Sequence, residues 1–329
     1  MLRLLNTSIL MVGFLLAPLI ATGAVGNGLE PQEPAAPPQR AVLITGASTG
    51  LGRATAELLA QRGFFVYAGA RKESDLKELG AIANVQAIRL DVTKQEEIDA
   101  AVAVVRAAGR GLYAVINNAG VGVFGPMIEL SEADLDFQFD VNVYGPYRVT
   151  KAFAPLLIES RGRIATTGSI SGTVTWGMGG AYCMSKHAVE AFTDALALEL
   201  GPLGVQVSVI DPGNYRSEIS QNARQRLEAQ GYSPENSRFR REMERLLAGP
   251  ADRATEKDPI EVAEAFLHAL TDETPKRRYL VVPNAREAEV TIRSALARVA
   301  QLNAEQPYEY DRETLIRMLD DALAANPPR

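Results

Sequence analysis

The chain has 329 residues, of which 47% are hydrophobic and 22% are charged, and its net charge is −6. This balance fits one large α/β domain or two small ones, and the absence of a long basic run argues against nucleic acid as a partner. The single cysteine, Cys183, excludes an internal disulfide and a cysteine-based zinc site. His187 and His268 lie far apart in the sequence, so we expect no metal.

The N-terminal segment is predicted to lie outside the fold. Residues 4–25 follow Arg3 and carry no charge, and about 20 apolar residues suffice to span a bilayer. The segment also resembles a signal peptide with its small-residue end, and a start site placed too far upstream is a third interpretation. A Pro- and Glu-rich linker completes residues 1–39.

From residue 41, short apolar runs rich in β-branched residues alternate with amphipathic stretches. Such runs are typical of strands buried on both faces. The expected strands span residues 41–47, 64–70, 85–92, 113–120, 163–169, 205–211 and 278–284. The expected helices span residues 50–63, 93–109, 131–160 (interrupted at Gly145-Pro146) and 258–272, and another begins near Ala181. This alternation predicts an α/β fold with a doubly wound, parallel, seven-stranded sheet of the Rossmann type.

Two regions break the alternation. Residues 214–256 are polar, arginine-rich and helical in tendency, and they follow the sixth strand. An insertion there would lie over the carboxyl ends of the strands, where ligands bind, so it is either a substrate lid or a surface excursion. We therefore expect one catalytic domain over residues 40–285, with a lid at about 214–256, and a C-terminal helical tail over residues 286–329.

A glycine-rich turn, "LITGASTGLGRA", follows the first strand and opens the first helix. Its glycines are spaced Gly46-x3-Gly50-x-Gly52, which differs from the GxGxxG fingerprint but serves the same purpose. Glycines allow the backbone to approach a pyrophosphate at the helix N-terminus, where N–H groups and the helix dipole favour anions. The predicted phosphate-binding turn comprises Gly46, Ser48, Thr49, Gly50, Leu51 and Gly52.

The end of the second strand bears on the choice of cofactor. A carboxylate there would bind the adenosine ribose and favour NAD, whereas this sequence places Arg71 and Lys72 at that point. Arginine suits a 2′-phosphate because its guanidinium forms bidentate, charge-assisted bonds. NADP(H) is therefore preferred, while the nearby Glu73 and Asp75 keep NAD(H) possible.

Tyr182 and Lys186 stand four residues apart at the head of a predicted helix, so they share one face. They could be an ordinary surface pair. A phenol with a pKa near 10 is a poor acid or base at neutral pH unless its anion is stabilised, and an adjacent ammonium lowers the pKa of a phenol. The pair therefore indicates catalysis if further catalytic residue types accompany it.

Those companions are present. "TGASTGLG", "NNAG" at Asn117–Gly120, Ser169, "YCMSK" and "DPG" at Asp211–Gly213 occur in order, and together they resemble the short-chain dehydrogenase/reductase family over residues 40–284. The resemblance implies that Tyr182 is the catalytic acid/base, that Lys186 lowers its pKa and holds the nicotinamide ribose, and that Ser169 binds the reacting oxygen. It also implies that Asn142 completes a water-mediated proton relay with the lysine.

The family's cofactor contacts carry over in the same way. The resemblance implies that Asp91 and Val92 flank the adenine, that Asn118, Ala119 and Gly120 line the central ribose, and that Pro212, Gly213, Tyr215 and Ser217 lie against the carboxamide. Ser217 stands where the family usually has threonine, which keeps the hydroxyl. Between Ser169 and Tyr182, Trp176 and Met178 are candidates for lining the substrate pocket or for packing under the lid.

The chemistry that these side chains can perform agrees with an NAD(P)-dependent alcohol dehydrogenase or carbonyl reductase. Hydride transfer to a carbonyl leaves negative charge on oxygen, which donors aimed at that oxygen stabilise, while the cofactor supplies the hydride. The chain looks similar to members that act on retinoids, steroids or other lipophilic alcohols and ketones. The alternatives are a reductase of 3-oxoacyl thioesters or small ketones and, from another class, a non-catalytic NADP(H)-binding sensor.

The predicted cofactor also bears on location. NADP is not expected outside the cell. We therefore expect residues 4–25 to be a retained membrane anchor rather than a cleaved secretion signal. If the start site is misplaced, we expect a cytoplasmic protein. The charges flanking the segment favour the non-cytosolic side for the body, which leaves this point open. The resemblance implies a homo-oligomer built through the long helix and the helix of Tyr182.

Overall fold

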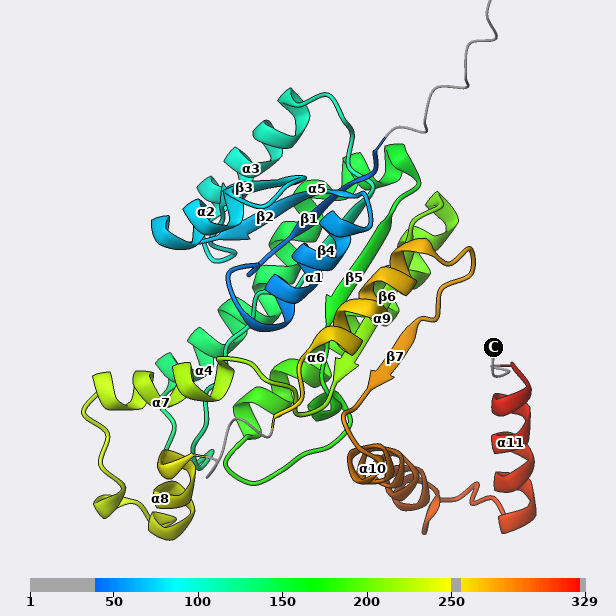
Figure 1. Cartoon of the computed structure of the whole chain (residues 1–329). Helices are drawn as coiled ribbons and strands as arrows, with labels where there is room; N and C mark the ends of the chain where they lie inside the picture. The colour runs from blue at the N-terminus through cyan, green and yellow to red at the C-terminus, as the bar shows by residue number, and fades with distance from the viewer. Residues whose placement is uncertain (1–38, 250–255, 326–329) are drawn as a thin grey trace, which may run out of the picture. The chain divides into compact units, whose positions relative to one another are not determined.

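The computed structural model describes residues 39–249 and 256–325 (Figure 1). The chain divides after Pro38, and all described residues belong to the unit Gln39–Arg329. The predicted anchor at residues 4–25 lies outside the described residues and stays a prediction. Within the described ranges, no helix combines the length and the apolar character that crossing a membrane requires.

Seven parallel strands form one sheet in the order β3-β2-β1-β4-β5-β6-β7. They are β1 (Ala41–Ile44), β2 (Phe65–Ala70), β3 (Val85–Arg89), β4 (Ala114–Asn117), β5 (Arg163–Thr167), β6 (Gln206–Pro212) and β7 (Arg278–Val281). The predicted fold class is confirmed. Several strands end before their apolar sequence runs do, because the last residues of those runs leave the sheet and form loops at its carboxyl edge, where Gly46, Asn118 and Ser169 lie.

Helices cover both faces of the sheet (Figure 1). On one face, α1 (Gly50–Gln61), α2 (Glu73–Gly80) and α9 (Ile260–Thr271) pack on inward side chains such as Val42 and Ile44. On the other face, α3 (Gln95–Ala107), α5 (Gly145–Ser160) and α6 (Gly180–Leu200) pack on the alternate side chains, such as Leu43. Since successive strand residues point to opposite faces, apolar runs without alternation bury both sides of the sheet. The sequence analysis did not predict α2.

The long helix predicted over residues 131–160 is interrupted, as expected, just before Gly145. It consists of α4 (Glu132–Phe139), a π-helical turn at Asp140–Tyr144 and α5. A Cβ on Gly145 would lie 2.7 Å from Cγ2 of Val92, so only glycine allows this close packing. π-Helical turns are rare and often occur at functional sites, and this one holds the buried Asn142.

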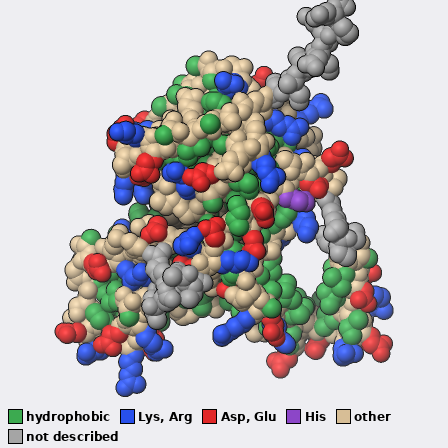
Figure 2. Space-filling model, in the orientation of Figure 1, with side chains coloured by type: hydrophobic (Ala, Val, Ile, Leu, Met, Phe, Trp, Pro, Cys, Tyr) green, Lys and Arg blue, Asp and Glu red, His purple; other side chains and the backbone are tan. Residues whose placement is uncertain are grey.

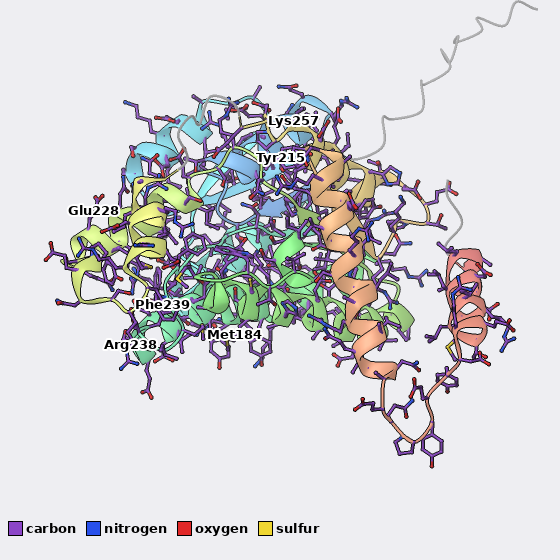
Figure 3. All side chains as sticks on the ribbon, turned by 90° about the horizontal axis from the view of Figure 1, so that it is seen from below. Met184, Tyr215, Glu228, Arg238, Phe239 and Lys257 are labelled. Atoms are coloured by element: carbon purple, nitrogen blue, oxygen red, sulfur yellow. The ribbon has the colours of Figure 1, made fainter. Side chains whose placement is uncertain are left out.

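The insertion after β6 contains α7 (Ile219–Ala229) and α8 (Arg240–Ala248). Its two ends meet: Tyr215 forms a parallel β-bridge with Lys257, and the N–H of Arg216 donates to the Lys257 carbonyl at 2.9 Å. Figure 3 shows Tyr215 and Lys257 side by side. The insertion is therefore a loop that is closed at its base.

In the described part of the chain after β7 lie the helices α10 (Ala285–Asn303) and α11 (Arg312–Ala325). α10 contacts the body through the buried Thr291 and through Ser294, whose Oγ donates to the Thr173 carbonyl at 3.3 Å. α11 buries none of its side chains. Hydrophobic side chains gather over both helices in Figure 2, among them the exposed Leu296 and Leu319.

Candidate active site

A cavity of about 700 Å³ opens at the carboxyl edge of the sheet. It brings together nearly all the residues that the sequence singled out: Gly46, Ser48, Thr49, Gly50, Leu51, Gly52, Arg71, Asp91, Val92, Asn118, Ala119, Gly120, Ser169, Trp176, Tyr182, Lys186, Pro212, Gly213, Tyr215 and Ser217. Asn142 and Met178 do not line it. The insertion contributes further lining residues, including Ile219, Arg224 and Leu246, so it covers the cavity.

The glycine turn places the N-terminus of α1 at the cavity. Gly46 has a φ of +65° and lies so close to Ala119 that a Cβ would be 2.7 Å from that residue's Cα. The Asn118 amide donates to the Gly46 carbonyl at 3.0 Å and holds the turn against the loop after β4. Thr49 precedes α1 but makes no side-chain capping bond. The first-turn N–H groups therefore lack a cap from that side chain, which suits a bound phosphate.

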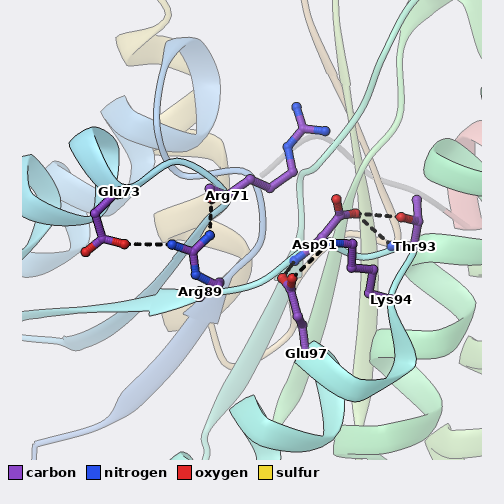
Figure 4. Close-up of polar contacts among 7 residues, drawn as sticks. All are labelled: Arg71, Glu73, Arg89, Asp91, Thr93, Lys94 and Glu97. Carbon is purple, nitrogen blue, oxygen red and sulfur yellow. Dashed lines mark hydrogen bonds and ion pairs between the residues drawn. The ribbon is translucent and has the colours of Figure 1, made fainter.

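Arg71 lies at the end of the cavity next to β2 and β3 (Figure 4). Among residues 39–249 and 256–325, no carboxylate forms an ion pair with its exposed guanidinium. Glu73 instead binds Arg89 at 2.6 Å, and Arg89 also donates to the Arg71 carbonyl at 2.6 Å. Of the two acids that keep NAD possible, Glu73 is therefore engaged by another arginine, and Asp75 accepts from the Ser74 hydroxyl at 3.1 Å.

Asp91 follows β3 in the same part of the cavity (Figure 4). Its Oδ1 accepts hydrogen bonds from the N–H of Thr93 at 3.0 Å and from the Thr93 hydroxyl at 2.8 Å. Its own N–H donates to Glu97 at 2.7 Å. Asp91 is therefore held in place by the start of α3, beside the position expected for an adenine.

Tyr182 lies in the first turn of α6, beside Ser169. The Ser169 hydroxyl lies close enough to the Tyr182 hydroxyl to lower the pKa of the phenol. Burial raises the pKa of Tyr182 to about 12, and the Ser169 hydroxyl opposes this only in part. Desolvation of the phenol is therefore the largest effect on this pKa, and a lowering contribution of Lys186 stays a prediction.

Lys186 is buried one turn further along α6, at 6% exposure. Its ammonium lies 5.7 Å from the centre of the Tyr182 ring and donates to the Thr167 carbonyl at 2.8 Å. Burial lowers the pKa of Lys186 to about 8, against the opposing effect of Asp211 and Glu190. The lysine therefore remains mostly charged at pH 7, although it is close to its titration range.

Ser169 follows β5 and is held from three sides. Its N–H donates to Asp211 Oδ1 at 3.1 Å, and its Oγ accepts the N–H of Ser171 at 3.1 Å. The remaining contact of its hydroxyl is with Tyr182. Two hydroxyl groups thus converge where a carbonyl oxygen could accept from both.

Asn142 lies behind the cavity wall. Its Oδ1 accepts the N–H of Val121 at 2.8 Å, and its Nδ2 donates to the Val121 carbonyl at 3.0 Å and to Ser185 at 3.1 Å. These bonds fix the loop after "NNAG". They do not reach Lys186, so its role in a proton relay stays a prediction.

Phe124 is a lining residue that the sequence analysis missed. Its ring lies 5.5 Å from that of Trp176 and 5.8 Å from that of Tyr182. Its place soon after the fourth strand, at the carboxyl edge of the sheet, could have indicated it. Met178 has a φ of +65°, and its carbonyl accepts the N–H of Gly125 at 2.7 Å. It therefore anchors the loop that carries Phe124.

Comparison with known proteins agrees with this arrangement of the site. The profile adh_short, described as short chain dehydrogenase, matches residues 40–228. The chain belongs to the short-chain dehydrogenase/reductase family. It is thus an oxidoreductase, and the family resemblance noted in the sequence is confirmed.

Relatives in this family are similar over most of the chain. "Uncharacterized oxidoreductase YbbO" of Escherichia coli (strain K12) is 35% identical over 74% of this chain and 86% of its own. The mitochondrial D-beta-hydroxybutyrate dehydrogenase of Bos taurus is 36% identical over 73% of this chain and 76% of its own. "Retinol dehydrogenase 16" of Rattus norvegicus is 34% identical over 72% and 79%, respectively.

Solved short-chain dehydrogenases share the fold. A protein from Burkholderia cenocepacia J2315 in complex with NADP has a TM-score of 0.63 and 25% identity, covering 82% of this chain and 98% of its own. A protein from Burkholderia phymatum in complex with NAD has a TM-score of 0.67 and 26% identity, covering 83% and 97%. These neighbours bind NADP or NAD at an equivalent fold, without distinguishing between the two for this chain.

Proposed function

We propose that this short-chain dehydrogenase/reductase interconverts a lipophilic alcohol and its ketone or aldehyde with NADP(H). The observation that carries the proposal is the convergence of Tyr182 and Ser169 on one cavity, with Lys186 one helical turn away and the aromatic rings of Phe124 and Trp176 alongside. Each hydroxyl can donate to one substrate oxygen, and the rings provide apolar surface for the substrate body.

In the direction of reduction, the raised pKa keeps Tyr182 protonated and able to donate its proton to the carbonyl oxygen. Ser169 donates a hydrogen bond to the same oxygen as negative charge develops there. Bound NADP(H) supplies the hydride to the carbonyl carbon. The Lys186 ammonium, 5.7 Å from the tyrosine ring, stabilises the phenolate that remains until solvent returns the proton.

The residues present fit the cofactor. The uncapped first turn of α1 suits the pyrophosphate, and the exposed Arg71 suits a 2′-phosphate. Glu73, which would favour NAD, is bound to Arg89. These contacts support NADP(H) over NAD(H).

The lining of the cavity supports a lipophilic substrate. Val174 and Ile170 join the aromatic pair from the catalytic side, and Ile219 and Leu246 join from the insertion. A relative named retinol dehydrogenase is consistent with a large apolar alcohol.

A second candidate is a substrate that also carries an anionic group, such as a 3-oxo acid or its thioester. Arg224 and Arg245 of the insertion line the cavity, and one relative is named D-beta-hydroxybutyrate dehydrogenase. Guanidinium groups bind carboxylates and phosphates well. Arg245 also pairs with Glu242 at 3.2 Å, which leaves Arg224 as the stronger candidate contact.

The test is NADPH oxidation by the full-length protein against retinoid, steroid, 3-oxoacyl thioester and small ketone substrates, with Tyr182→Phe measured alongside. Turnover with retinoid or steroid carbonyls that is lost in the variant supports the proposal. Turnover confined to thioesters supports the second candidate. Tight NADPH binding without turnover of any class contradicts both and indicates a nucleotide-binding sensor.

We also propose that the protein is a homo-oligomer through α5 and α6. Large side chains on this face are exposed, including Tyr147 at 49% and Met184 at 47%, and Figure 3 shows Met184 pointing outward from it. Met184→Asp should convert the oligomer to monomer in light-scattering measurements of mass. A wild-type monomer would contradict the proposal.

A further inference from the structure

Two carboxyl groups lie behind the catalytic residues: that of Asp211 on β6, which is 6% exposed, and that of Glu190 on α6, whose side chain is 15% exposed. The two carboxyls are close enough to interact directly. Asp211 Oδ1 also accepts the N–H of Ser169 at 3.1 Å, and Glu190 Oε2 accepts from Arg278 at 2.6 Å. The chemistry proposed for Tyr182 uses neither carboxyl.

Direct contact between these two carboxyls, in a site with so few donors, requires a proton on one of them. An ionised carboxylate has only acceptors, so two of them cannot hydrogen-bond to one another. Glu190 Oε1 is buried, and no N–H or O–H group of the described residues donates to it. A bond between the two side chains therefore exists only when one of them is a neutral carboxylic acid.

The surroundings assign the proton to Asp211. Glu190 has Arg278 as a charged donor, whereas the donor that reaches Asp211 from the described backbone is the N–H of Ser169. Arg278 Nη2 also donates to both carboxylate oxygens of Asp194 at 3.3 Å. The Lys186 ammonium faces the pair from α6 but donates to the Thr167 carbonyl.

Arg277, the neighbour of Arg278 in the chain, lies 4.0 Å from Asp194. The space around the pair is closed: a Cβ on Gly168 would lie 2.0 Å from Asp211 Oδ1, and one on Gly172 would lie 2.9 Å from Glu190 Oε1. Burial is the largest cause and the negative charge of Glu190 the next in raising the pKa of Asp211 to about 9, which agrees with this geometry.

We infer that Asp211 and Glu190 hold one proton between them, carried by Asp211, and that neutral Asp211 is a positioning residue for the backbone of Ser169. Only its role in catalysis rests on the proposed function. A second negative charge at this point would repel Glu190 and would raise the cost of a phenolate at Tyr182 nearby.

The test compares the stability of the wild type with that of Asp211→Asn from pH 5 to pH 8. Asparagine cannot ionise, yet it can still accept from Ser169 and donate to Glu190. In the wild type, the folded state keeps a proton that the unfolded state, with an aspartate pKa of about 4, releases. The wild-type unfolding constant, divided by that of the variant, should therefore rise about tenfold per pH unit and level off above pH 9.

Asp194→Asn is the matched control, because Asp194 lies on the same helix as Glu190 and binds the same arginine as Glu190, but its side chain is 45% exposed. Its ratio to the wild type should not change over this range. A pH-independent ratio for Asp211→Asn would overturn the inference, because it would mean that Asp211 is ionised in the folded protein. Unfolding needs no substrate, so this result is separate from the failure of the proposed function.

If Asp211→Asn does not fold, infrared spectra of the wild type provide an alternative test of the inference. A carbonyl stretching band of a neutral carboxylic acid should be present at pH 7 and absent from Glu190→Gln, whose amide can donate to an ionised Asp211. Absence of the band from the wild type would contradict the inference. Once a substrate is known, Asp211→Leu should lower kcat with little change in KM. Ser169→Ala should then lower kcat by a smaller factor in the Asp211→Leu variant than it does in the wild type.

Discussion

The charged side chains at the two ends of the cavity differ in burial and in their bonds to the rest of the chain. At the catalytic end, Lys186 and Asp211 are buried and bonded to their own chain, and burial dominates the pKa of each. At the adenosine end, Arg71 is exposed, and its guanidinium has no ion pair among the described residues. The difference teaches that the chemistry is set by the folded interior before any ligand binds, whereas cofactor choice depends on a few exposed side chains.

The largest effect is expected at the catalytic end. Tyr182→Phe removes the proton donor but keeps the ring that packs against Phe124. The rate of carbonyl reduction should fall by about 10² to 10⁴, the usual contribution of general acid catalysis. NADPH affinity, measured by fluorescence titration, should stay nearly unchanged. A large loss of affinity would mean that the phenol serves binding rather than chemistry.

A smaller and selective effect is expected at the adenosine end. Arg71→Glu should weaken NADPH binding by about 10- to 100-fold, the equivalent of a lost charge-assisted hydrogen bond and its replacement by a like charge. NADH affinity should be kept. Lys72→Glu is the control, since it makes the same charge change one residue away but does not line the cavity. Equal losses in both variants would indicate a general field effect.

The insertion covers the cavity and is attached to α4 through Asp134. This carboxylate accepts from Arg226 at 2.9 Å and from Gln230 at 3.1 Å. Burial tends to raise its pKa, but these bonds and that of Ser131 lower it to about 2. A lowered carboxyl pKa contributes stability above the unfolded value of about 4, and this contribution is lost as the pH falls towards 2.

Asp134→Asn should therefore reduce the free energy of unfolding by about 1–2 kcal/mol at pH 7, and by much less at pH 2. Urea unfolding at the two pH values measures this. Asp136→Asn, which changes an exposed carboxylate on the same helix, should have no such pH-dependent effect. An equal effect of both variants would show that the bonds to the insertion add no stability.

The smallest effect sharpens the assignment of the adenosine end. Glu73→Gln breaks an exposed pair with Arg89, whose side chains are 84% and 50% exposed. It should lower the free energy of unfolding by less than about 1 kcal/mol, and NADH affinity should not change. A marked loss of NADH affinity would show that Glu73 leaves Arg89 to bind a ribose.

The comparison also shows how far the sequence predicts this molecule. The apolar runs and the glycines that follow them are sufficient to predict the strands of the sheet, because strands that are buried on both faces require apolar residues along their whole length. The spacing of Tyr182 and Lys186 fixes their shared helical face for the same local reason. Their positions in the cavity follow from the order of the strands.

The rest depends on contacts between distant segments. The pKa of Tyr182 is raised rather than lowered because desolvation depends on everything packed around the phenol. Glu73 is engaged by Arg89 from the neighbouring strand, which no spacing within one helix reveals. The Asp211–Glu190 pair joins β6 to α6 and was not apparent in the motif "DPG". Phe124 lines the site through a loop whose path the sequence does not determine.

The β-bridge between Tyr215 and Lys257 has an evolutionary consequence. Because the insertion leaves the body and returns to it at one point, residues between the two can be lengthened, shortened or exchanged without shifting the register of β6 against β7. The base is further held by Glu261, which accepts from Tyr215 at 2.5 Å and from Lys257 at 2.5 Å. The part of the cavity wall that the insertion provides can therefore be replaced while the residues on the sheet side of the cavity stay in place.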